Sequence, residues 1–196
     1  TNEVEGFPQS WMMLDIAALQ AAYGADYTAN AGNTVYRWTP DSGRTTINAG
    51  VLRANTLANG GAASSIGAST NAAANLVLGG GTLQYTGGTV STDRNYTLTA
   101  GTTSTVDVTT GGTTLVISGA STATTGALTK IGTGTLTLSG ANLYTGLTTI
   151  NAGTLRYGAA NALSTGAVTV NDGGTCDLAG FSDSIGALAV NSGATG

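Results

Sequence analysis

The sequence has no histidine, a single cysteine and only two prolines, and each scarcity narrows the possible structures. Without histidine, the chain lacks the commonest zinc ligand and the usual base that activates a nucleophile. The single cysteine, Cys176, cannot form a disulfide within the chain. Its neighbours in TCDLAG alternate like a strand, which favours a buried small hydrophobe over a reactive thiol. A disulfide scaffold and a histidine-dependent enzyme are therefore excluded.

Charge is scarce as well, since only 8% of the residues are charged and the net charge is −4. Nucleic-acid binding needs clustered Lys and Arg, and the six basic residues are scattered, so we expect no nucleic-acid partner. No apolar run approaches the roughly 18 residues of a membrane helix. The chain also opens with an acidic, polar stretch instead of a basic signal-peptide start. These features predict a soluble chain without an export signal of its own.

Glycine and short polar residues take the place of charge. The chain contains 31 glycines, yet 41% of its residues are hydrophobic, so it is not of the disordered class. Its polarity comes from Thr, Ser and Asn, which is typical of sheets whose outer faces carry rows of short side chains. The composition predicts β structure.

One stretch near the N-terminus has helical periodicity. In residues 10–24, SWMMLDIAALQAAYG, Ser10 can cap a helix, apolar residues recur at steps of three and four, and Gly24 can end it. We predict one amphipathic helix over residues 11–23. After about Gly43 the pattern changes to short runs that alternate apolar residues with Thr or Ser and close on Gly or Asn, which predicts strands and turns.

An internal repeat favours a particular β architecture. TTINAGVLR at Thr45–Arg53 returns as TTINAGTLR at Thr148–Arg156, so the offset between Ile47 and Ile150 is 150 − 47 = 103 residues. The recurring NAG, NDG and NSG turns indicate identical corners, so we predict a mainly β chain with a parallel solenoid over residues 44–196. At about 20 residues per coil, it would contain about seven coils. An immunoglobulin-like sandwich is the alternative.

The repeats also predict which side chains point inward, because matching apolar positions should share a face. The predicted inward residues are Ile47, Leu52, Leu136, Leu138, Ile150 and Leu155.

The run LTKIGTGTLTLSGANLYTGLTTINAGTLRYG, Leu128–Gly158, resembles the passenger-associated transport repeat of autotransporters. Asn161–Leu188 is similar to its continuation, and with the copy at Thr45 the resemblance covers about three quarters of the chain. It implies a right-handed β-helix in the exported passenger of a Gram-negative surface protein, with that bacterium's export machinery as a partner. No translocator barrel is present in the sequence, so we do not expect a whole autotransporter.

Residues 7–38 are similar to a second family, the serralysin-type zinc metalloproteases, in DIAALQxxYGA and GNTVYRW. This resemblance implies a helix that packs under a zinc site and a calcium-binding loop, here at Asn30, Gly32 and Thr34. The HExxHxxGxxH zinc motif and the GGxGxDxUx calcium repeats are missing. We therefore expect no metal-dependent hydrolysis and interpret residues 1–43 as a helical remnant or cap.

Several carboxylates are candidates for a functional site. Asp15 and Asp26 flank the predicted helix and could pair as acid and base, but the helix dipole explains Asp15 near a helix start. Asp172, Asp177 and Asp183 lie close in sequence, and oxygen-rich turns can hold calcium. Their spacing fits no calcium loop, so turn-forming aspartates are favoured.

The aromatic residues concentrate near the N-terminus. Trp11, Trp38, Tyr23, Tyr27 and Tyr36 could form a glycan platform or the core of a small cap, and the cap is favoured because a solenoid needs cover over its first coil.

The sequence is compatible with three functions: an extracellular structural or adhesive solenoid, a carbohydrate-binding solenoid, and a polysaccharide-active enzyme. Residues 44–196 hold only five acidic side chains, which disfavours the third. We expect no catalytic, cofactor-binding or metal residues. After Val190 nothing is charged, bulky or proline-containing, so the C-terminal coil should be an uncapped edge capable of self-association.

Overall fold

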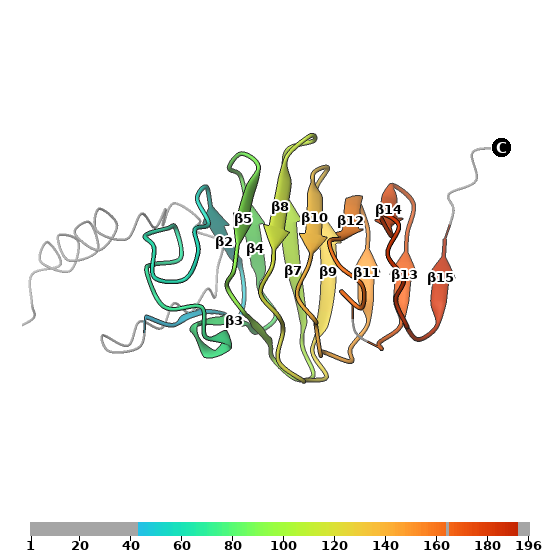
Figure 1. Cartoon of the computed structure of the whole chain (residues 1–196), viewed down its shortest axis with the longest axis horizontal. Coiled ribbons are helices and arrows are strands. Elements are labelled where there is room, and N and C mark those ends of the chain that lie inside the picture. The colour runs from blue at the N-terminus through green and yellow to red at the C-terminus, as the bar shows by residue number, and fades with distance from the viewer. Residues whose placement is uncertain (1–42, 164, 192–196) are drawn as a thin grey trace, which may run out of the picture.

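A computed structural model describes residues 43–163 and 165–191, which form a stack of parallel strands (Figure 1). The strands lie in three sheets, and every strand pair is parallel. This pairing excludes an immunoglobulin-like sandwich, whose sheets are antiparallel. The chain is a parallel β-solenoid. The helix predicted at residues 11–23 lies outside the described residues.

The largest sheet has seven strands, the second has five and the third has three. The seven-stranded sheet contains β2 (Val51–Ala54), β4 (Thr82–Tyr85), β7 (Thr103–Val108), β9 (Ala127–Ile131), β11 (Thr148–Ile150), β13 (Val168–Val170) and β15 (Leu188–Val190). The five-stranded sheet contains β5 (Val90–Thr92), β8 (Thr114–Ile117), β10 (Thr135–Leu138), β12 (Gly153–Tyr157) and β14 (Gly174–Asp177). The three-stranded sheet contains β1 (Thr45–Ile47), β3 (Leu76–Leu78) and β6 (Thr97–Leu98). A single 3-10 turn, η1 (Ala73–Asn75), precedes β3.

The coils are not uniform in length. Bonded residues on adjacent turns are 20 apart at Asn151 and Asn171 but 31 apart at Arg53 and Gln84. The estimate of about 20 residues per coil is confirmed for the C-terminal half and is wrong for the first turns. Although the largest sheet has seven strands, only five turns place strands in both larger sheets, which is fewer than the predicted seven coils.

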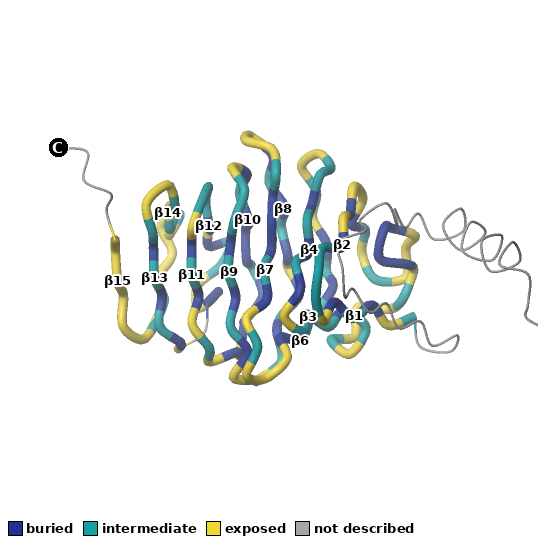
Figure 2. The backbone as a smooth tube through the Cα atoms, turned by 180° about the vertical axis from the view of Figure 1, so that it is seen from behind, coloured by how far each residue is buried: buried dark blue, intermediate teal, exposed yellow. Residues whose placement is uncertain are grey.

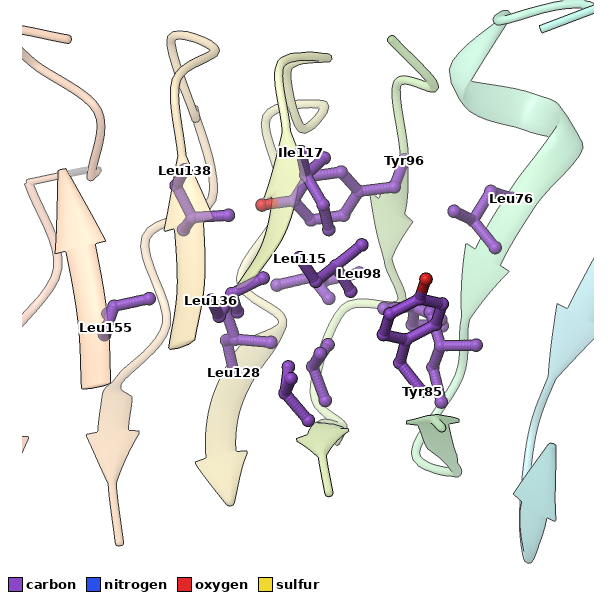
Figure 3. Close-up of a cluster of buried hydrophobic side chains, with 14 of the residues drawn as sticks. Leu76, Tyr85, Tyr96, Leu98, Leu115, Ile117, Leu128, Leu136, Leu138 and Leu155 are labelled. Atoms are coloured by element: carbon purple, nitrogen blue, oxygen red, sulfur yellow. The ribbon is translucent and has the colours of Figure 1, made fainter. Parts of the chain in front are cut away.

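The core lies inside the stack, because buried residues alternate with more exposed ones along strands such as β4, β8 and β11 (Figure 2). All six residues predicted to point inward are at most 2% exposed: Ile47, Leu52, Leu136, Leu138, Ile150 and Leu155. Figure 3 shows leucines from several turns, including Leu115, Leu136 and Leu155, directed into this interior. Stacking therefore buries on each turn a face that one coil alone could not cover.

Glycines stand where corners of successive turns approach closely. A Cβ at Gly140 would overlap the carbonyl oxygen of Gly119 on the preceding turn. Gly153 has φ +62°, a conformation that residues with a Cβ rarely adopt, and it follows the Asn151–Ala152 corner. Glycine is required at Gly140 for space and at Gly153 for backbone conformation.

The two near-identical copies of the repeat lie on different sheets. In the first copy, β1 belongs to the three-stranded sheet and β2 to the seven-stranded sheet. In the second copy, β11 belongs to the seven-stranded sheet and β12 to the five-stranded sheet. Each copy forms a strand, a corner and a second strand. The second copy lies one sheet further around the solenoid than the first, because the coils between the copies differ in length.

Candidate functional site

The outer faces of the two larger sheets carry threonines that are stacked in register. The long threonine row, on the seven-stranded sheet, consists of Thr82, Thr105, Thr129, Thr149 and Thr169. The short threonine row, on the five-stranded sheet, consists of Thr114, Thr135, Thr154 and Thr175. Neighbouring members are separated by the strand spacing of about 4.8 Å. Within the described residues, none of these nine hydroxyls has a hydrogen-bond partner in the protein.

An amide ladder continues alongside the long threonine row. The Nδ2 of Asn171 donates to the Oδ1 of Asn151 over 2.6 Å, and the Nδ2 of Asn191 donates to the Oδ1 of Asn171 over 2.8 Å. Each residue directly follows its strand, so the ladder marks the same corner on three successive turns. Since a primary amide has two N–H donors, Asn171 and Asn191 each keep one donor outside the ladder.

Charge on the outside of the seven-stranded sheet is confined to its first rungs. The Nε of Arg53 donates to the Oε1 of Gln84 over 2.9 Å, and the Nε2 of Gln84 donates to the Oδ2 of Asp107 over 2.9 Å. From β9 to β15 the outward strand positions of this sheet are uncharged. This part of the face consists of short aliphatic and hydroxyl side chains.

Lys130 is fully buried within the solenoid, at an inward position of β9. Its Nζ donates to the carbonyl oxygens of Ile131, Gly132 and Ala152, at 2.6, 2.9 and 3.3 Å. Burial disfavours the charged amine and lowers the pKa of Lys130 to about 8, although Asp107 opposes the shift. The amine joins two successive corners and is closed to ligands.

Arg94 is the second buried cation and is 1% exposed. Its Nε donates to the carbonyl oxygen of Ala58 at 3.0 Å, and its Nη1 donates to the carbonyl and hydroxyl oxygens of Ser69 at 3.0 and 2.9 Å. Its Nη2 donates to the carbonyl oxygens of Ala62 and Gly67 at 3.3 and 2.8 Å. All five N–H groups of the guanidinium are thus satisfied, and Arg94 organises the strand-free segment that lengthens the first coil.

A buried amide connects three further turns. Asn142 Oδ1 accepts from the Tyr96 hydroxyl at 2.8 Å and from the Ser121 backbone N–H at 2.9 Å. Asn142 Nδ2 donates to the carbonyl oxygens of Ala162 and Gly140, at 2.6 and 3.1 Å. Burial raises the pKa of Tyr96 well above its ordinary value, so this network is neutral and structural.

The C-terminal end of the described stack is apolar. A cavity of about 400 Å³ lies there, lined among others by Tyr157, Cys176 and Ile185. Leu188 and Val190 of β15 are 57% and 67% exposed (Figure 2). Val168 and Val170, their register partners, are buried. The cavity is therefore the uncovered end of the core.

The three aspartates near this end accept local hydrogen bonds or lie in turns, and none faces another across a shared site. Asp177 Oδ1 accepts from the Ala179 N–H at 2.8 Å, and Asp183 accepts from the N–H groups of Leu163 and Ser184 at 2.8 and 2.7 Å. Asp172 lies in the turn between β13 and β14. The turn-forming interpretation is confirmed for Asp172 and Asp177, whereas Asp183 lies in irregular chain and its Oδ2 accepts from Leu163 on the preceding turn. Across residues 43–163 and 165–191, no three His, Cys, Asp or Glu side chains are grouped to hold a metal ion.

Cys176 lies in β14 and packs against the core, but it is only half-buried. Burial raises the pKa of its thiol, with Asp177 and Asp183 adding to the shift. Cys176 packs against the core, as predicted, but it is not fully buried because it lies beside the cavity at the end of the stack.

The remaining candidates lie outside the described residues and stay predictions, as does the serralysin-like reading of residues 7–38. They are Asp15, Asp26, Trp11, Trp38, Tyr23, Tyr27, Tyr36, Asn30, Gly32 and Thr34.

Sequence reasoning missed three of the buried polar side chains, namely those that bond to backbone groups of several turns: Lys130, Arg94 and Asn142. For Lys130 the sequence did contain a signal. In the alternating run ALTKI, Lys130 stands at a position where the alternation places an inward, apolar residue. Arg94 and Asn142 lie in irregular segments whose partners are distant in sequence, with separations of up to 46 residues. No local pattern identifies them.

Comparison with known proteins places the repeat that contains Lys130 in a family. Residues 128–156, which include the inward lysine and both corners that it joins, match the passenger-associated transport repeat. The chain carries an autotransporter passenger repeat. It is also 48% identical over 151 residues to the adhesin BmaC autotransporter of Brucella suis biovar 1 (strain 1330), a match that covers 76% of this chain.

The match covers only 4% of the length of that relative. No solved structure matches the chain significantly. Among the described residues, the passenger repeat and its neighbours form no helix with the length and apolarity of a membrane span. The passenger repeat itself corresponds to two adjoining turns, β9 with β10 and β11 with β12.

Proposed function

We propose that this chain is a non-enzymatic segment of a large extracellular surface protein of a Gram-negative bacterium, and that it serves as a structural or adhesive solenoid. The observation that supports this proposal most directly is that the passenger repeat forms two turns of an uninterrupted parallel stack. The similarity to an autotransporter described as an adhesin supports the same role and makes the export machinery of the outer membrane a partner.

The architecture suits a projecting element. Each turn bonds to the next by parallel ladders, and the buried side chains of Lys130 and Asn142 connect neighbouring turns. A stack of this kind contacts only its neighbours and can extend by repetition.

Cell labelling tests the proposal. Antibodies raised against the purified chain should label intact cells of the source bacterium, and the purified chain should compete with those cells for adherence to host tissue or matrix. Labelling that requires permeabilised cells would overturn the extracellular assignment. Labelling of intact cells without competition would leave a structural role and overturn the adhesive one.

A carbohydrate-binding module is the second candidate, because the threonine rows present hydroxyls that have no partner in the described protein. A non-catalytic part of a larger secreted protease is a further alternative, and it rests on residues 7–38 alone.

A further inference from the structure

Asn59 and Gly60 form the one Asn-Gly pair of the sequence, and they lie in the strand-free segment between β2 and β3. An asparagine side chain can cyclise when the backbone nitrogen of the next residue attacks its amide carbon. Glycine obstructs that attack least, because it has no Cβ. Asn59 is exposed and Gly60 is half-buried, so water also reaches the pair.

Asp93 bonds to both partners of such a cyclisation. Its Oδ1 accepts from the backbone N–H of Gly60 at 2.7 Å, and its own backbone N–H donates to the Oδ1 of Asn59 at 3.0 Å. A carboxylate within hydrogen-bond distance of a proton has the geometry of a general base. An N–H directed at an amide oxygen stabilises the negative charge that develops on that oxygen during attack. One residue thus supplies both the base and an oxyanion donor.

The turn that carries the pair is held in place from outside. The N–H of Ala62 donates to the carbonyl oxygen of Asn59 at 3.0 Å, which closes a β-turn. Arg94, which directly follows Asp93, is buried and donates to the carbonyl oxygens of Ala58 and Ala62 at 3.0 and 3.3 Å. The reacting groups are therefore positioned before the reaction, which lowers its entropic cost.

We infer that Asp93 catalyses the cyclisation of Asn59 onto the Gly60 nitrogen, so that the chain modifies itself at this turn. The Gly60 nitrogen bonds to the Asn59 Cγ and passes its proton to the Asp93 Oδ1. The Cγ–Nδ2 bond of Asn59 then breaks, and the leaving nitrogen takes up that proton and departs as ammonia. Water opens the resulting succinimide and leaves either aspartate or isoaspartate at position 59.

The modification changes both the charge and the backbone of this turn. The product carries a carboxylate at position 59, which lies beside that of Asp93, and like charges placed so close repel. The isoaspartate form also lengthens the backbone. We expect the segment from Ala58 to Ser69, to which the guanidinium of Arg94 bonds, to loosen after conversion.

Peptide mapping by mass spectrometry tests the inference on the purified chain, incubated in its folded state at neutral pH. The conversion appears as the mass gain that separates a carboxyl group from an amide, and released ammonia is an independent readout. We expect the conversion to concentrate at Asn59. It should be faster in the folded wild type than in the same chain in guanidinium chloride, where Asp93 is no longer in place.

Two substitutions separate catalysis by Asp93 from simple bonding. Asp93→Asn keeps an oxygen that can accept from the Gly60 N–H but removes the base, so conversion should slow by about 100-fold. Asp93→Ala removes the acceptor as well and should be equally slow. The matched control, Asp177→Asn at the other end of the stack, should convert like the wild type, and all four proteins should convert equally when unfolded.

Faster conversion in Asp93→Ala than in the wild type would show that Asp93 protects the pair, and this would overturn the inference. An unchanged rate in Asp93→Asn would overturn it too, because basicity would then play no part. The comparison of folded and unfolded wild type needs no variant to fold, and slower conversion in the folded chain would equally refute catalysis. Cleavage of the bond between Asn59 and Gly60 in place of ammonia release would do the same.

Discussion

Two cations are enclosed by the solenoid, and backbone carbonyl oxygens serve as the direct acceptors for most of their N–H groups. Lys130 bonds to three carbonyl oxygens, and Arg94 bonds to four carbonyl oxygens and one hydroxyl. Among the described residues, the ion pair is instead on the surface, between Arg156 and Asp177 at 3.5 Å. The buried cations thus tie together backbone segments that carry no side-chain charge.

The pKa of Lys130 predicts a pH dependence of stability. In the folded chain it is about 8, below the ordinary value of 10.5, so between these values the unfolded chain binds more protons. Stability should therefore rise with pH across this window, by an amount on the order of 3 kcal/mol. Urea unfolding at pH 7.5 and pH 10.5 should show this rise in the wild type and not in Lys130→Met.

The surface variant Arg156→Met is the control for that comparison and should keep the wild-type pH dependence. Tyrosines that titrate in the same range are common to all three proteins and cancel in the differences. If Lys130→Met and the wild type gained equal stability, the pKa of the buried amine would not be depressed.

Arg94 cannot be replaced by lysine, because an ammonium offers three donors where the guanidinium uses five. Arg94→Lys should lower the free energy of unfolding by about 1–3 kcal/mol, since buried carbonyl oxygens lose their donors. Hydrogen exchange should also accelerate at residues 58–69. Arg53→Lys, at an exposed position, should change stability by no more than about 0.5 kcal/mol, and an equal effect of the two substitutions would contradict the role of Arg94.

At the scale of an element, the corners limit which side chains the coil can carry. Gly140 lies against Gly119 of the preceding turn, and a Cβ there would meet backbone atoms that cannot rotate away. Gly111 lies at another corner, where a Cβ would be 3.5 Å from the Thr133 hydroxyl, an ordinary contact. Neither glycine has a positive φ, so the two sites differ in space and not in backbone conformation.

We therefore predict opposite outcomes for the same substitution. Gly140→Ala should destabilise the chain by about 1–3 kcal/mol through overpacking. Gly111→Ala should be neutral, or stabilising by up to about 1 kcal/mol, because it restricts the unfolded chain. Thermal unfolding of both variants makes the comparison, and equal melting temperatures would show that the corners tolerate extra volume.

For the whole molecule, the exposed end of the core predicts association. Leu188 and Val190 occupy inward positions and are largely exposed on β15, whose outer edge is uncovered in the described structure. An open parallel strand leaves N–H and C=O groups for another strand to pair with. Sedimentation velocity should show an apparent mass that rises with concentration.

Val190→Lys should abolish this association, since an inward-pointing charge blocks edge pairing. Its cost in stability should be small, within about 0.5 kcal/mol, because the side chain is 67% exposed. Thr110→Lys, at an exposed corner in the middle of the stack, should associate like the wild type. A wild-type chain that stays monomeric at high concentration would refute the prediction.

The sequence by itself determined the local units of this protein. Alternation along runs such as TTI and TLTL fixed which residues face inward, and glycine or asparagine fixed where strands end. The six predicted inward residues are buried because the alternation of apolar and polar residues gives each strand one apolar face, and that face packs into the core. The turn role of Asp177 was readable from the sequence for a similar reason, since it depends on the backbone N–H two residues further on.

Only the tertiary structure decided which units stack on which. The nearly identical copies at Thr45–Arg53 and Thr148–Arg156 occupy different pairs of sheets, because the coils between them vary in length. The total length of those coils cannot be inferred from the local sequence of either copy. The threonine rows exist only once the register is set, although each threonine was visible in the sequence. Arg94 and Asn142 likewise acquired their roles from partners many residues away, which stacking alone brings within hydrogen-bond distance.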